Sequence, residues 1–127
     1  MSSETAVFSD HLQSGESVRC AFSAWVRAGL ARRVLGVTDR RVIMVRSAYW
    51  RLSDKGLLWA DPIDQVALHG TYGVLLLNGL NTGNAYVRLR RADGTTVTFN
   101  PRSSFVGNTE SAVRNVERLF DLVPGRL

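Results

Sequence analysis

The chain has 127 residues, of which 45% are apolar and 21% are charged, and its net charge is +5. These values fit a single globular domain over residues 1–127 and argue against a disordered chain. No apolar run approaches the roughly 18–20 residues that a membrane-spanning helix needs. The first residues also lack the basic and apolar regions of a secretory signal. We therefore expect a soluble, cytoplasmic protein.

The residue types that carry most enzyme chemistry are few and scattered. The single cysteine, Cys20, cannot form an intrachain disulfide, and its alternation with Val18 and Phe22 is typical of a buried small hydrophobic residue. The two histidines, His11 and His69, lie far apart in the sequence, and no His–Cys–carboxylate cluster or nucleophile elbow is present. The sequence thus predicts no catalytic, cofactor-binding or metal-binding residues, and we expect a protein that is not an enzyme.

The order of the predicted elements is a short N-terminal segment, seven strands and one helix. Residues 4–14 favour a short helix or turn, which Ser14-Gly15-Glu16 ends. Residues 17–27 alternate between the two faces of a strand, as a half-buried strand does. The predicted strands span residues 17–27, 30–37, 42–49, 63–69, 74–77, 85–91 and 95–100.

Two of these strands give more detail. The continuous apolar run Val42-Ile43-Met44-Val45 is typical of a strand that is covered on both faces or curls around a core. Asp93-Gly94 lies between two alternating runs and predicts a tight hairpin. The expected outward face of this hairpin holds Tyr86, Arg88, Arg90, Thr96 and Thr98.

The last element is an amphipathic helix. Apolar residues recur at helical spacing from Phe105 to Val123, and Pro124-Gly125 stops the pattern. Asn108 or Ser103 could cap its first turn. A stripe of this kind predicts a helix that packs against the core.

Several segments, taken in order, resemble a bacterial pleckstrin-homology (PH-like) domain. Leu12-Gln13-Ser14-Gly15-Glu16 is similar to the opening of that family, and Gly36-Val37-Thr38-Asp39-Arg40-Arg41-Val42-Ile43 is similar to its Thr-Asp-x-Arg turn. Asp61-Pro62-Ile63 is similar to a later strand start of the family. A final strand with Phe99 and the closing helix complete a resemblance over roughly residues 12–122. The related GRAM-type domains share this pattern.

The resemblance implies a mainly β fold with one C-terminal helix, in which seven antiparallel strands form a bent barrel or sandwich that the helix caps. It also implies a binding module, because PH domains bind phosphoinositides through basic residues of the first hairpin. Here that hairpin offers Arg27, Arg32 and Arg33, without the usual Lys-x(n)-Lys/Arg-x-Arg spacing. Some bacterial relatives resemble oligomerising scaffolds.

Basic residues are concentrated in the first half of the chain, where two tryptophans lie close to them in the sequence. Residues 18–59 hold nine basic and two acidic side chains, and residues 50–60 combine two Trp with two cations. Leu57, Leu58 and Trp59 could begin the next strand and plug the barrel, or the loop could be an exposed apolar tip ringed by cations. The candidate ligand or partner surface comprises Arg27, Arg32, Arg33, Arg40, Arg41, Trp50, Arg51, Lys55 and Trp59.

We therefore expect a non-enzymatic binding or adaptor module that engages a protein, a peptide or, weakly, an anionic membrane surface. The alternative is a structural subunit that self-assembles into a homo-oligomer through sheet edges. Nucleic-acid binding ranks lower, because the sequence shows no recognition helix or RNA-binding motif and its net charge is modest.

Overall fold

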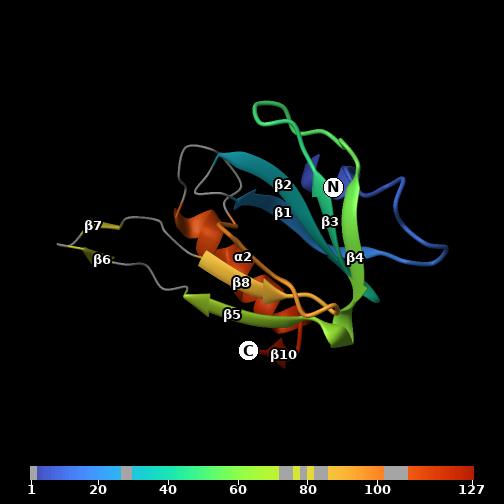
Figure 1. The fold of residues 1–127 in the computed structure, drawn as a ribbon. Coiled ribbons are helices and arrows are strands. Elements are labelled where there is room, and N and C mark those ends of the chain that lie inside the picture. The colour runs from blue at the N-terminus through green and yellow to red at the C-terminus, as the bar shows by residue number, and fades with distance from the viewer. Residues whose placement is uncertain (1–2, 27–29, 72–75, 78–79, 82–85, 102–108) are drawn as a thin grey trace.

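Two four-stranded sheets and a C-terminal helix make up most of the fold (Figure 1). The computed structural model describes residues 3–26, 30–71, 76–77, 80–81, 86–101 and 109–127. The first sheet has the order β1-β2-β3-β4 and consists of β1 Val18–Val26, β2 Ala31–Thr38, β3 Arg41–Arg46 and β4 Leu57–Pro62. The second has the order β10-β5-β8-β9 and consists of β5 Ala67–Thr71, β8 Tyr86–Arg90, β9 Thr96–Phe99 and β10 Gly125–Arg126. The remaining elements are α1 Ser3–Ala6, the 3₁₀ helix η1 Ile63–Gln65, the short pair β6 Leu76–Leu77 and β7 Leu80–Asn81, and α2 Thr109–Leu122.

The two sheets share one apolar core. Phe22 and Val37 of the first sheet pack in the same buried cluster as Leu68 and Leu89 of the second. The predicted class, mainly β with one C-terminal helix, is confirmed. The described strands are not closed into a barrel, because each belongs to one of separate sheets. No helix in the described ranges is long and apolar enough to cross a bilayer.

The first sheet is buried on both faces. Val42 and Met44 point into the shared core, whereas Ile43 and Val45 pack in a second cluster with Phe8 of the N-terminal segment. Phe8 is fully buried over Gly36, where a Cβ atom would lie 2.7 Å from its ring. This double coverage explains why β3 is apolar at successive positions, as its sequence predicts.

Helix α2 covers the inner face of the second sheet. Val116 and Leu119 form its buried stripe, and they join the shared core together with Val123, which directly follows the helix. Phe120 packs over Gly70 of β5, where a Cβ atom would again lie 2.7 Å from the ring. The opposite face of this sheet carries the outward residues of β5, β8 and β9.

The β8–β9 hairpin forms as its sequence predicts. Gly94 has a φ of 90°, and the Asp93 carboxylate accepts hydrogen bonds from the backbone and the hydroxyl of Thr95 at 2.9 and 2.6 Å. Val87, Leu89 and Phe99 are buried. The local turn chemistry therefore sets this register.

The predicted bounds of the fourth strand and the predicted alternation of the first strand are wrong. The fourth strand is Leu57–Pro62 rather than 63–69, and the following residues form η1 before β5 begins at Ala67. In the first strand, the pairing register shifts between Val18 and Cys20, so Val18 packs with the Phe8 cluster and Cys20 with the shared core. A β-bulge of this kind breaks the alternation on which the prediction rested.

Three other predictions fall outside the described residues. These are the helix caps at Ser103 and Asn108, the first apolar residues of the helix at 105–106, and the first half of the predicted strand 74–77, whose second half is β6.

Candidate functional site

The predicted surface residues lie at two ends of the β2–β3 hairpin. Arg32 and Arg33 are at the start of β2, whereas Arg40 and Arg41 follow its end. Strand residues rise about 3.3 Å each and the chain folds back at Asp39-Arg40, so these two pairs are separated by roughly 20 Å. They cannot form one compact site.

The end that contains Arg41 is closed by a buried ion pair. Arg41 donates to Glu16 through Nη2 at 2.6 Å and through Nε at 2.9 Å, and its Nη2 also donates to the carbonyl of His11. The Glu16 side chain is 0% exposed and that of Arg41 only 18%. The hydrogen bond from Arg41 lowers the pKa of Glu16 from its ordinary 4.5 to about 2, against the opposing effect of burial.

Thr38 completes this network. Its hydroxyl donates to Glu16 at 2.7 Å and accepts from the backbone N–H groups of Arg40 and Arg41 at 3.0 and 2.8 Å. The side chain of Arg40 donates to the carbonyl of Ser14. The Thr-Asp-Arg-Arg turn therefore ties the N-terminal segment to the sheet, and its arginines have structural roles.

The opposite end is open, and we call it the arginine–tryptophan end; it comprises Leu30, Arg32, Arg33, Arg46, Tyr49 and Trp50. All of these except Trp50 line a cavity of about 260 Å³, which Ala31 and Ser47 complete. The backbone N–H of Ser47 donates to the carbonyl of Arg32, which joins the end of β3 to the start of β2. The cavity thus rests on two paired strands.

Arg32 is held in place by its neighbours on β1. Its Nε and Nη2 donate to the Ser23 hydroxyl at 3.1 and 2.8 Å, and its guanidinium lies 5.1 Å from the Trp25 ring centroid. Burial lowers the pKa of Arg32. Because an arginine remains protonated in proteins, this side chain adds a fixed positive charge to the cavity.

Arg33 and Arg46 occupy directly opposite positions on β2 and β3. Their side chains lie on the same face of the sheet, the one that carries Leu35 and Met44 further along. Like charges at opposite positions repel and destabilise a strand pair. Both side chains line the cavity, and Nη1 of Arg33 also donates to the Met44 sulfur at 3.7 Å.

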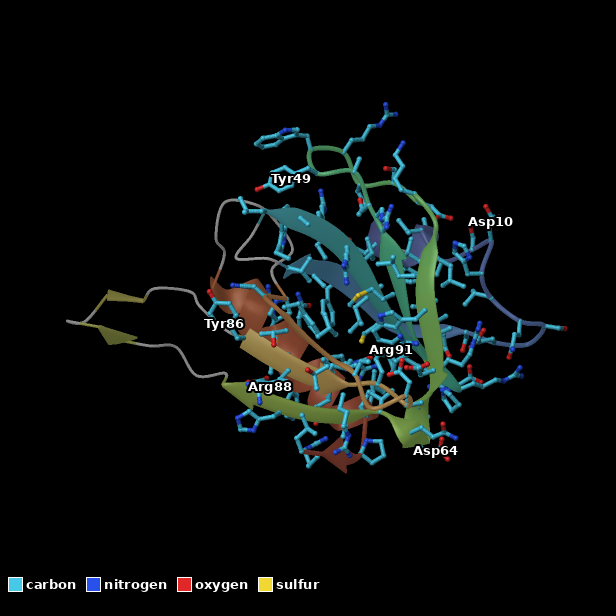
Figure 2. The ribbon with its side chains drawn as sticks, in the orientation of Figure 1. Asp10, Tyr49, Asp64, Tyr86, Arg88 and Arg91 are labelled. Atoms are coloured by element: carbon cyan, nitrogen blue, oxygen red, sulfur yellow. The ribbon has the colours of Figure 1, made fainter. Side chains whose placement is uncertain are left out.

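A row of aromatic rings leads from the sheet to the solvent. Trp25 packs edge-on against Tyr49 with ring centroids 5.4 Å apart, and Tyr49 packs edge-on against Trp50 at 4.8 Å. Trp50 is 79% exposed and Leu30 is 78% exposed. Figure 2 shows Tyr49 in the loop between β3 and β4, at this end of the first sheet.

The other predicted surface residues divide between this loop and the core. Arg51 and Lys55 are exposed in the loop between β3 and β4, which also holds Trp50. Trp59 is only 9% exposed, and the guanidinium of Arg91 lies 4.8 Å from its ring centroid while bonding to Asp61. Trp59 therefore lies within β4 and faces the core, so it leaves the candidate surface, as Arg41 does. Arg27 lies outside the described residues.

Sequence reasoning did not select Arg46, Tyr49 or Leu30. Arg46 was one basic residue among many, and only its register opposite Arg33 distinguishes it. The sequence did contain the necessary information. In a hairpin with a two-residue turn, residues equally distant from the turn lie opposite each other, and Arg33 and Arg46 are equally distant from Asp39-Arg40. The predicted turn could therefore have identified the Arg33–Arg46 pair.

The residues with catalytic potential do not come together. Cys20 packs against the core, and burial raises the pKa of its thiol to about 11. His69 is exposed on β5, and His11 forms a 2.7 Å pair with Asp54. Within the described residues, no group of three or more His, Cys, Asp or Glu side chains could hold a metal ion.

No family model matches this sequence, and no curated protein matches it either. Its function has to be argued from its own residues.

Proposed function

We propose that this chain is a non-enzymatic binding module of PH-like type whose arginine–tryptophan end docks on an anionic membrane surface. The observation that carries the proposal is a cavity lined by Arg32, Arg33 and Arg46 at the end of the sheet where Trp50 and Leu30 are exposed. Cations next to exposed apolar side chains are typical of surfaces that bind at a membrane interface. The two sheets around one core, with a C-terminal helix, are compatible with the PH-like resemblance.

Each part of this surface has a distinct task. Arg32, Arg33 and Arg46 attract lipid phosphates, and each cation near an anionic surface contributes about 1 kcal/mol. Trp50 and Leu30 bury apolar area at the headgroup boundary. Exposed Arg51 and Lys55 lie in the same loop and add to the attraction.

Vesicle co-sedimentation tests the proposal. The protein should bind vesicles with 30% phosphatidylserine and release them as salt rises, while neutral phosphatidylcholine vesicles should bind little. Arg33→Gln/Arg46→Gln should lower the partition coefficient about 30-fold, and Trp50→Ala about tenfold. The matched control Arg88→Gln/Arg90→Gln removes the same charge from the second sheet and should retain most binding.

Two results would contradict the membrane proposal. One is binding that ignores lipid charge and salt, and the other is an equal loss in the control variant. The same surface would then have to serve a protein or peptide partner.

Self-assembly through sheet edges is a second candidate, and the open sheets favour it. In the described part of the chain, β4 and β9 each pair with only one neighbouring strand. An edge strand can pair with another copy of the chain. Analytical ultracentrifugation should then show concentration-dependent dimers, and a monomer at high concentration would exclude this candidate.

A further inference from the structure

The outward face of β5, β8 and β9 forms a second polar surface, which we call the outer strand face; it comprises His69, Tyr86, Arg88, Arg90, Thr96 and Thr98. The pairing register places His69, Arg88 and Thr98 in one row across the three strands. Arg90 and Thr96 are opposite each other in the next row. The strand residues between them, Val87 and Leu89, point into the core, so these outward positions are held on a rigid support.

This face is hollowed. His69, Tyr86, Arg88 and Thr98 line a cavity of about 210 Å³. Tyr86 is 42% exposed, although it is a large aromatic residue. In Figure 2, Tyr86 and Arg88 lie along β8.

The charge of the face is positive and uncompensated. Among the described outward positions of β5, β8 and β9, none carries an acidic side chain. Arg88 and Arg90 make no ion pair with any described residue, in contrast to Arg91, which bonds to Asp61. The two free guanidinium groups therefore complement an anionic ligand.

We propose that the outer strand face binds single-stranded nucleic acid, with Arg88 and Arg90 on successive phosphates and a base stacked on Tyr86. Residues two apart on a strand are separated by about 6.7 Å, which is close to the spacing of phosphates along an extended single strand. An exposed aromatic ring beside cations is the arrangement that stacks bases with little sequence preference. His69 and Thr98 supply hydrogen-bonding groups to the same cavity.

The shape of the surface favours a single strand over a duplex. An open sheet face can accept splayed bases, whereas reading a duplex groove usually requires an inserted helix or strand ribbon. The described helix α2 buries its apolar stripe in the core on the other side of this sheet. The outer strand face belongs to the second sheet and uses none of the residues of the arginine–tryptophan end, so this inference is independent of the proposed membrane function.

Fluorescence anisotropy with labelled dT12 and rU12 tests the proposal at pH 7 and 50–200 mM KCl. Two phosphate contacts predict a slope of about −1.4 for log K against log salt, and Arg88→Gln should reduce that slope by about 0.7. Tyr86→Leu should weaken binding about tenfold without changing the slope. Binding by either oligonucleotide with this pattern supports the proposal, and the tighter one identifies the sugar.

Two controls separate this site from general attraction between charges. Arg51→Gln removes one exposed cation from the first-sheet loop and should leave oligonucleotide binding within about twofold of the parent. Inorganic polyphosphate with as many charges as dT12 should bind at least tenfold more weakly, because it has no bases. Thermal unfolding of each variant checks that the fold is retained.

Three outcomes would overturn the proposal. These are no binding of either oligonucleotide at 50 mM KCl, equal losses in the Arg51 and Arg88 variants, and equal binding of polyphosphate with no effect of Tyr86→Leu. None of them bears on the vesicle experiment, in which Arg33→Gln/Arg46→Gln and Trp50→Ala are the variants expected to lose binding.

Discussion

The two ends of the β2–β3 hairpin carry the same residue type in opposite electrostatic settings. Arg41 faces the buried carboxylate of Glu16, whereas Arg33 faces Arg46. The first arrangement satisfies its charges within the protein and ties the N-terminal segment to the sheet. The second brings two positive side chains to the wall of one cavity. The contacts of an arginine, rather than its presence in a basic stretch, therefore identify a structural role, and they separate Arg41 from the arginines of the proposed binding surface.

Among the substitutions that test this comparison, Glu16→Gln should change the free energy of unfolding most. The substitution keeps the size of the side chain but removes the charge that Arg41 faces in a buried site. Breaking a buried pair in this way should lower the free energy of unfolding by about 3 kcal/mol. Urea unfolding measures the loss, and the melting temperature should fall by roughly 10 °C.

A matched control for this variant is Glu117→Gln. Glu117 is exposed on α2, so the same chemical change should alter stability by less than about 0.5 kcal/mol. If Glu16→Gln cost no more than Glu117→Gln, the closed end would not depend on its ion pair.

The pH dependence of stability gives the next largest effect. The pKa of Glu16 falls from 4.5 to about 2 on folding, chiefly through the hydrogen bond from Arg41. Its stabilising contribution is therefore complete above pH 4.5 and declines as pH falls toward 2. Between pH 4.5 and 3 the contribution should fall by about 2 kcal/mol. Urea unfolding at several pH values should show this loss in the parent, while Glu16→Gln lacks it; parallel curves for the two proteins would refute the assignment.

At the open end, Arg46→Gln should have the opposite sign. The change removes one of two like charges at opposite strand positions, so the free energy of unfolding should rise by about 0.3 kcal/mol in 20 mM salt. In 0.5 M salt the gain should vanish, because screening already weakens the repulsion. Replicate denaturation curves at both salt concentrations measure it, with Arg51→Gln as the control. A clear destabilisation would mean that Arg46 has a structural role.

Trp50→Ala should change stability least. With 79% of its surface exposed, Trp50 contributes little to the core, so the free energy of unfolding should change by less than about 0.5 kcal/mol. The variant should also lose the fluorescence that acrylamide quenches readily, since Trp25 and Trp59 are buried. Persistent strong quenching would show that a different tryptophan is accessible.

Local sequence patterns predict much of this fold. Alternation and the Asp93-Gly94 turn predict the β8–β9 hairpin, and the run from Val42 to Val45 predicts a strand covered on both faces. The predicted position of the fourth strand is wrong because Pro62 was taken to precede a strand, whereas it is the last residue of β4. β4 is an edge strand, where the missing N–H of a proline need not disrupt a ladder.

The candidate site is less predictable, since it depends on contacts between distant residues. Glu16 and Arg41 are 25 positions apart, and nothing in their local sequence shows that they meet. Trp50 and Trp59 look alike as loop aromatics, yet the first is exposed and the second is buried within β4. Only tertiary packing distinguishes such pairs.

Two glycines have a consequence for how the covering segments are positioned. Phe8 sits over Gly36 on one sheet and Phe120 over Gly70 on the other, each where a Cβ atom would be too close. A ring can occupy such a place only opposite a residue without a side chain, so each glycine marks one permitted position along its strand. The missing side chains of these two glycines thus fix where the N-terminal segment and α2 pack on their sheets. If either glycine were moved by two positions along its strand, the aromatic ring and its segment should shift to the new glycine.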